Sequence, residues 1–241
     1  GVVGVMNRML TDRIAVKQRP FVVEIVGPAG AGKTTLVEAL SQRDQRIVAG
    51  VRFHKIGYVP FFIGNTLLIL PTFLRRYRHS RWFTLEESRS MVYLKAWHYF
   101  LSRPLQNNDV VVVLDHGPIF RLVLLREFGP EVIERQVYQR WWESTFHQWT
   151  ATLDMVIWLD APNPVLANRI HTRGRWHVVK GKPETEVNTF LSHYRASYER
   201  LLSTLTAGRG PKVLRFNTDQ ESPNQIADQV LATLASESIA G

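Results

Sequence analysis

The chain has 241 residues, a formal net charge of +9 and no cysteine. This length accommodates one large α/β domain, and the lack of cysteine excludes disulfides, thiolate metal sites and cysteine nucleophiles. With 45% hydrophobic and 21% charged residues, the composition is that of a folded protein. The basic excess predicts an anionic partner, such as phosphates, nucleic acid or a membrane surface.

The first residues lack the charged-then-apolar layout of a secretory signal. The longest apolar stretch, residues 58–73 (YVPFFIGNTLLILPTF), is interrupted by two prolines and an asparagine. It is also shorter than the ~20 residues that a membrane-spanning helix needs. We therefore expect a cytoplasmic protein, with peripheral contact at the inner membrane surface as the alternative.

Strands and helices alternate along the first half of the chain. Residues 21–26 (FVVEIV) predict a buried parallel strand, because they are β-branched and almost continuously apolar. A helix over 33–41 and a second strand over 46–53 should follow. Residues 56–108 are mostly helical in pattern, aromatic and basic, which predicts an insertion over one end of the sheet. Residues 109–115 (DVVVVLD) form the clearest strand.

The alternation continues through the second half. The expected elements are a helix over 130–150, a strand over 154–160, a helix from Pro164 capped by Asn163, a helix over 184–206, a strand over 212–217 and a closing helix from Ser222. Five strands alternating with helices predict a doubly wound α/β sheet with right-handed crossovers. No linker divides the chain, so residues 1–241 are expected to form a single domain.

A phosphate-binding loop follows the first strand. Residues 27–34 (GPAGAGKT) match the pattern G-x-x-x-x-G-K-[ST] between an expected strand and an expected helix. Lys33 should reach the β- and γ-phosphates of a nucleoside triphosphate, Thr34 should bind Mg²⁺, and Thr35 should contact the α-phosphate. The predicted donor-site residues are Gly27, Ala29, Gly30, Ala31, Gly32, Lys33, Thr34 and Thr35.

A carboxylate ends the strand over 109–115. Asp115 lies where open α/β sheets bind ligands. It can hold Mg²⁺ together with Thr34, or accept a proton from an attacking hydroxyl. The structural alternative is a cap for the helix that begins near Ile119. We predict a catalytic or metal-binding role for Asp115 and leave open whether it acts as a base or only through Mg²⁺.

Three arginines follow the strand over 154–160. Arg169 and Arg173 are four residues apart, so they are expected to share one helix face, and Arg175 follows Gly174. Arginines converging on a mobile segment suit the spread charge of a phosphoryl-transfer transition state. We predict catalytic roles for all three, alongside Lys33. A solvated basic face is the alternative.

Four stretches together resemble the P-loop nucleoside and nucleoside-monophosphate kinases, among them thymidylate kinases and deoxynucleoside kinases. They are GPAGAGKTT, VVVVLDHGP, WLDAPNPVLANRIHTRGR and VLRFNTDQESPNQIADQVLATL. The resemblance implies a three-layer αβα P-loop NTPase fold with a five-stranded parallel sheet of order 2-3-1-4-5. The implied core is 20–55 and 109–237, with 56–108 as a helical acceptor-binding insertion and 169–182 as an arginine-bearing lid.

The resemblance also implies ATP as donor and Mg²⁺ as cofactor. Arg169 would pack against the adenine side, and Arg173 or Arg175 would meet the transferring phosphate. The loop from Asn217 to Gln220, including Asp219, would border the adenine.

The acceptor half departs from these kinases. An arginine commonly follows the acid at the end of their third strand, where this chain has His116. Deoxynucleoside kinases carry a carboxylate after the second strand, where this chain has His54 and Lys55. Arg89 and Tyr93, four residues apart, could complete the pocket or simply belong to the core. The predicted acceptor-binding residues are His54, Lys55, Arg89, Tyr93 and His116.

The leading prediction is an ATP- and Mg²⁺-dependent kinase for a nucleoside or nucleoside monophosphate. One alternative is a kinase for a non-nucleotide or lipid-linked acceptor at a membrane, since residues 59–83 join an apolar stretch to several arginines. The other is an NTP-hydrolysing switch, although a switch usually receives its arginine from a partner. ATP and a small acceptor are the expected partners, and a homodimer stays open. Nucleic acid is not expected, because no zinc or helix-turn-helix pattern is present.

Overall fold

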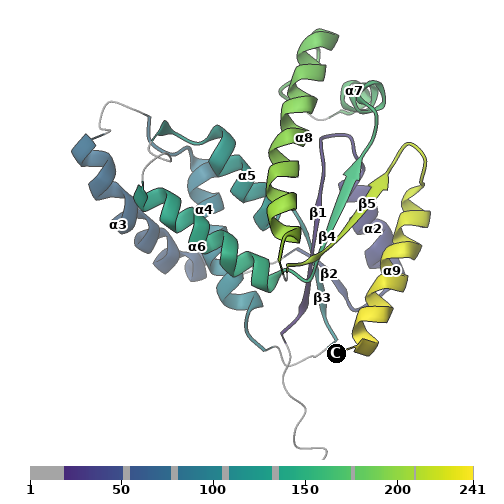
Figure 1. Cartoon of the computed structure of the whole chain (residues 1–241), viewed down its shortest axis with the longest axis horizontal. Coiled ribbons are helices and arrows are strands. Elements are labelled where there is room, and N and C mark those ends of the chain that lie inside the picture. Colours follow the sequence, from purple (N-terminus) through teal and green to yellow (C-terminus); the bar gives the residue numbers. More distant parts are fainter. Residues whose placement is uncertain are drawn as a thin grey trace, which may run out of the picture.

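One parallel sheet forms the centre of the protein (Figure 1). The computed structural model describes residues 19–50, 55–76, 81–104, 109–131, 136–174, 177–208 and 210–240. Five strands lie in the order β2-β3-β1-β4-β5, which confirms the predicted topology. The strands are β1 (Phe21–Val26), β2 (Ile47–Ala49), β3 (Val111–Asp115), β4 (Met155–Asp160) and β5 (Lys212–Asn217).

Helices cover both faces of this sheet. Along β1, Val23 and Ile25 belong to one core and Val22 and Val26 to the other, because alternate residues of a strand point to opposite faces. The helices are α2 (Lys33–Arg43), α3 (Val59–Arg76), α4 (Leu85–Leu101), α5 (Pro118–Phe128), α6 (Gln136–Thr152), α7 (Asn163–Thr172), α8 (Glu184–Thr206) and α9 (Pro223–Ala240), with a short 3-10 helix, η1, at Lys55–Tyr58.

Helices α3, α4 and α6 form a layer on one side of the molecule, to the left of the sheet in Figure 1. Three tryptophans on α6 join this layer together. The indole N–H groups of Trp141, Trp142 and Trp149 each donate a hydrogen bond to a different helix. The acceptors are Asn65 Oδ1 on α3, Leu122 O on α5 and Leu94 O on α4. Burying an indole in this way adds packing area without leaving its donor unpaired.

Several element boundaries differ from those predicted. Strand β2 covers only Ile47–Ala49 and is followed by Gly50, whose φ of +76° turns the chain out of the sheet. Helix α6 begins at Gln136 rather than at residue 130, and the separate helix α5 precedes it. The prediction that Asn163 caps α7 was wrong: Asn163 is the first residue of the helix, and its side-chain oxygen accepts a hydrogen bond from Arg195.

Candidate active site

The glycine-rich loop between β1 and α2 is held closely against β4. A Cβ added to Gly27 would lie 2.1 Å from the carbonyl oxygen of Leu159, so only glycine fits there. The Lys33 ammonium donates hydrogen bonds to the carbonyls of Gly27 at 2.8 Å and Pro28 at 3.1 Å. From α8, the Tyr194 hydroxyl donates to the Gly27 carbonyl at 3.0 Å. The loop is therefore tied to three parts of the fold.

Burial changes the acidity of Lys33. Desolvation lowers its pKa from 10.5 to about 8, while nearby Asp115 acts in the opposite direction and Arg173 adds to the lowering. A buried ammonium that is held only by neutral carbonyls gains strongly from a polyanion, because the anion replaces the lost hydration of the charge. This is the electrostatic requirement of a phosphate site.

Thr34 and Asp115 meet at the carboxyl end of β3. The Thr34 hydroxyl donates to Asp115 Oδ2 at 3.3 Å, and Asp115 Oδ1 is buried without a hydrogen-bond partner in the described part of the chain. An alcohol oxygen beside an unsatisfied carboxylate oxygen fits Mg²⁺, which prefers oxygen ligands. No group of three or more His, Cys, Asp or Glu side chains able to hold a metal occurs among the described residues. A magnesium ion here would therefore bind together with nucleotide phosphates.

A cavity of about 310 Å³ opens over this end of the sheet. It brings together much of the predicted donor site with part of the predicted acceptor site. Two aromatic residues of α8, Phe190 and Tyr194, close one side of it. The predicted site residues that line it are Ala29, Gly30, Gly32, Lys33, Thr34, Asp115, His116 and Arg173.

A second cavity of about 310 Å³ lies on the other side of the loop. Thr35 and Arg169 line it, and Arg169 donates hydrogen bonds to the Gly30 carbonyl and to both the hydroxyl and the carbonyl of Thr218. Asn217 lines a separate groove instead, and its side-chain oxygen accepts the backbone N–H of Asp219. Thr218 lies between the predicted residues Asn217 and Asp219, and it is Thr218 that lines the second cavity.

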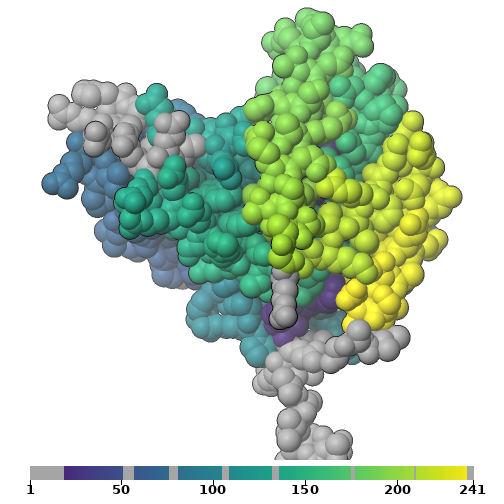
Figure 2. Space-filling model, in the orientation of Figure 1, coloured from purple at the N-terminus to yellow at the C-terminus, as the bar shows by residue number. Residues whose placement is uncertain are grey.

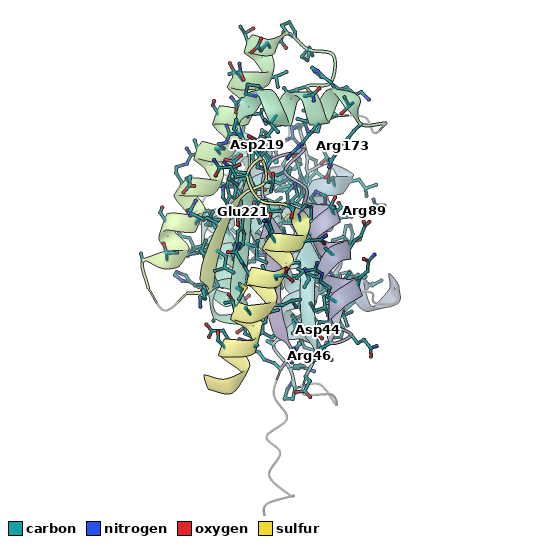
Figure 3. All side chains as sticks on the ribbon, turned by 90° about the vertical axis from the view of Figure 1, so that its right-hand side faces the viewer. Asp44, Arg46, Arg89, Arg173, Asp219 and Glu221 are labelled. Atoms are coloured by element: carbon teal, nitrogen blue, oxygen red, sulfur yellow. The ribbon has the colours of Figure 1, made fainter. Side chains whose placement is uncertain are left out.

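Two of the three predicted arginines, Arg169 and Arg173, lie within the described residues. Helix α7 ends at Thr172, so Arg173 is its C-cap residue (φ −67°, ψ 141°) and the helix is one residue shorter than the predicted pairing assumes. Arg169 and Arg173 nevertheless line the same cavity. Arg173 lines both cavities from beyond the helix end, and its carbonyl accepts a hydrogen bond from Lys180. Figure 3 shows Arg173 and Asp219 near the same end of the molecule, far from Asp44 and Arg46. Arg175 lies outside the described residues.

The predicted acceptor residues are dispersed. His116 has a φ of +58°, and its Nδ1 lies 3.8 Å from Asp115 Oδ1. Burial is the main cause that lowers the pKa of His116. Arg89 is exposed and Tyr93 is half-buried, and neither lines the cavity over Asp115. His54 and the side chain of Lys55 lie outside the described residues.

Sequence reasoning missed Glu24, an acid inside the buried strand β1. Its carboxylate accepts hydrogen bonds from the backbone N–H groups of Ile119 at 2.7 Å and Phe120 at 3.0 Å. Glu24 therefore caps α5, the role considered for Asp115 as the structural alternative. Desolvation raises the pKa of Glu24 to about 8. The signal in the sequence was an acid within an otherwise apolar strand, because a buried carboxyl group needs hydrogen-bond partners.

Arg121 on α5 was also missed. Its guanidinium carbon lies 4.7 Å from the ring centroid of Tyr93 and 5.0 Å from that of Trp97. It donates to Ser90 Oγ at 3.0 Å, while its Nε is buried without a partner in the described residues. Burial lowers the pKa of Arg121, and no described carboxylate forms a salt bridge with it. Only the fold reveals it, because its aromatic partners come from another helix.

Comparison with solved structures identifies the fold. No protein-family model and no curated protein matches the chain. YorR from Bacillus subtilis, solved with phosphorylated GDP, aligns over 90% of this chain and 96% of its own, with 16% identity and a TM-score of 0.50. Thymidylate kinase from Candida albicans aligns over 91% and 93%, with 14% identity and a TM-score of 0.51. Deoxyadenosine kinase from M. mycoides aligns over 90% and 100%, with 16% identity and a TM-score of 0.47.

The chain has a P-loop nucleoside and nucleotide kinase-like fold. YorR and the Candida albicans thymidylate kinase each align with about nine-tenths of the chain, which itself has a five-stranded parallel sheet of order β2-β3-β1-β4-β5. Identities of this size show the fold alone.

Proposed function

We propose that the protein is an ATP- and Mg²⁺-dependent phosphotransferase that passes a γ-phosphoryl group to a small acceptor, with a nucleoside or a nucleoside monophosphate as the leading class. The observation that carries this proposal is the placement of Lys33, Thr34 and Asp115 around one cavity at the carboxyl ends of the strands. A phosphate cradle, a metal-binding pair of oxygens and a cation are the parts that phosphoryl transfer requires.

On the donor side, the loop amides and Lys33 hold the β- and γ-phosphates. Arg169, which links Gly30 to Thr218, positions the adenine side, and Arg173 faces the phosphates from the beginning of the lid, residues 169–182. The Thr34 hydroxyl and the Asp115 carboxylate would hold Mg²⁺, which when bound neutralises phosphate charge. Positioning and charge stabilisation supply most of the catalysis in such a site.

On the acceptor side, the pocket would lie between α5 and the neighbouring helix α4 of the insertion. Arg121 and the rings of Tyr93 and Trp97 offer a cation and flat apolar surfaces, which suit a planar acceptor carrying hydrogen-bond acceptors or negative charge. Asp115 lines the cavity and accepts a hydrogen bond from Thr34, so it is the group that would accept a proton from a hydroxyl acceptor.

The test is a screen of nucleosides and nucleoside monophosphates for acceptor-dependent ADP release from ATP and Mg²⁺. Lys33→Ala should abolish the activity while the protein stays folded. Lys212→Ala is the matched control, because Lys212 pairs with Glu237 at the surface, away from the cavity. ATP hydrolysis that no acceptor stimulates would favour the NTP-hydrolysing switch. Absence of Mg²⁺-dependent ATP binding would refute both functions.

A further inference from the structure

Helix α3 exposes an extended apolar face. Val59, Ile63 and Leu67 lie four residues apart and so share one side of the helix, and Leu67 is 68% exposed. No residue from 59 to 74 is charged. We call these residues the α3 face: Val59, Phe62, Ile63, Leu67, Leu68 and Leu74.

The opposite side of α3 is firmly packed, so the exposure does not reflect a loose helix. Ile69 is buried, Phe73 makes an edge contact with Trp82 at 4.5 Å, and the Asn65 side chain accepts the Trp141 N–H. Figures 1 and 2 show α3 at the outer edge of the molecule, on the far side of its helical layer from α9. Several large apolar side chains exposed along one helix are typical of an interaction site.

Positive charge lies at both ends of the α3 face. Arg75 follows Leu74 and is exposed. At the other end, the Arg103 guanidinium lies 3.6 Å from the ring centroid of Tyr99, which contacts Phe61. Residues 56–104 contain seven Lys or Arg and only two acids, and one of these, Glu87, is bound by Arg81 at 2.9 Å.

This charge pattern distinguishes between the surfaces that could cover the face. In an isologous pair of copies, a parallel arrangement of two α3 helices brings Arg75 beside its symmetry mate, and an antiparallel one brings Arg75 toward Arg103. Both arrangements place like charges together, which opposes pairing. An anionic lipid surface offers hydrocarbon to the apolar side chains and negative headgroups to both arginines.

We propose that the α3 face docks on a membrane leaflet rich in anionic lipid, with its apolar side chains at the headgroup boundary and its arginines among the headgroups. The contact is peripheral: none of the described helices is long and apolar enough to cross a bilayer. The proposal does not depend on the phosphotransferase activity.

Flotation of the purified protein with lipid vesicles tests this docking. At low salt, the wild type should bind vesicles of phosphatidylcholine with phosphatidylglycerol about ten-fold more strongly than vesicles of phosphatidylcholine alone, and 0.5 M salt should weaken the binding. Ile63→Glu with Leu67→Glu should lower binding by about ten-fold or more. Ile63→Ser with Leu67→Ser should also lower it, although the net charge is unchanged.

The matched control is Ala232→Glu with Ala235→Glu on α9, which adds the same charge at two exposed positions on the other side of the molecule (Figure 1). It should retain vesicle binding. Thermal unfolding of each variant establishes that it is folded. Equal binding to both lipid mixtures, or equal loss in the control, would overturn the proposal. The proposal would also be overturned if sedimentation showed that the wild type is a dimer and that the variant Ile63→Glu with Leu67→Glu is a monomer.

Discussion

The Glu24 carboxylate of β1 accepts the backbone N–H of Ile119 at 2.7 Å and so fixes the start of α5. This bond joins the central strand to the turn that carries Asp115 and His116. Desolvation raises the pKa of Glu24 from 4.5 to about 8. Between these values the native state holds a proton that the unfolded chain has released. The contribution of Glu24 to the free energy of unfolding therefore falls as pH rises through this interval.

We expect Glu24→Gln to remove this pH dependence. The wild type should lose stability relative to the variant by up to about 1.4 kcal/mol per pH unit between pH 5 and 8. Urea unfolding of both proteins across this range measures the difference in stability. The difference is the informative quantity because His98, His116 and His177, whose pKa values are lowered, contribute with the opposite sign in both proteins. A difference that does not change with pH would show that Glu24 is ionised throughout.

Gly117 leaves no room for a side chain beside this carboxyl group. A Cβ there would lie 2.8 Å from Glu24 Cδ and 2.9 Å from Leu114 Cβ. Gly117→Ala should therefore destabilise the protein by about 1–3 kcal/mol through overpacking. Gly64→Ala on α3 is the control, because a Cβ at Gly64 meets nothing within 4 Å. It should stabilise the helix by up to about 1 kcal/mol, and denaturant melts compare the two.

Asp115→Asn tests the function of the Asp115 carboxylate without removing the side chain from the fold. The amide keeps the size of the side chain, but it cannot accept a proton from a hydroxyl acceptor and it binds Mg²⁺ next to Thr34 less well. We expect kcat to fall by about 100-fold or more, with a much smaller change in ATP affinity measured by calorimetry. Equal losses in both quantities would indicate that Asp115 only anchors the metal. Excess Mn²⁺ should restore part of the activity if the lost function is metal binding.

Lys33 should make nucleotide binding depend on pH. Because burial lowers its pKa to about 8, the free protein loses this proton as pH rises through 8, and ATP affinity should fall in the same interval. The unfolded chain keeps the proton to about pH 10.5, so the contribution of Lys33 to the free energy of unfolding rises from pH 8 to 10.5. Calorimetry at pH 8.5 in buffers of different ionisation enthalpy should detect proton uptake with ATP, and Lys33→Ala should abolish it.

The sheet and the glycine-rich loop between β1 and α2 were predictable because their signals are local. Continuous β-branched runs mark β1, β3 and β4, and the loop pattern lies between a strand and a helix in the sequence itself. The strand order came from the resemblance to the kinases rather than from any single strand. Boundaries such as the start of α6 were less predictable, because they depend on packing against other elements.

The less predictable part of the site consists of contacts between distant segments. Glu24 and Ile119, which are hydrogen-bonded, lie far apart in the sequence. Likewise, no sequence pattern near Arg121 predicts that its guanidinium will lie over the rings of Tyr93 and Trp97. Helical spacing also did not show that α7 ends one residue before Arg173. Side chains that act from irregular backbone follow no period, so a periodic pattern cannot locate them.

The hydrogen bonds of Arg195 fix the beginning of α7. From α8, this arginine pairs with Asp160 at the end of β4, and it also donates to the Ala161 carbonyl and the Asn163 side chain at the start of α7. These hydrogen bonds hold the beginning of α7 against both the sheet and α8. If Arg173 meets the transferring phosphate as proposed, its movement would come from backbone rotation after Thr172, where α7 ends, rather than from a displacement of the whole helix.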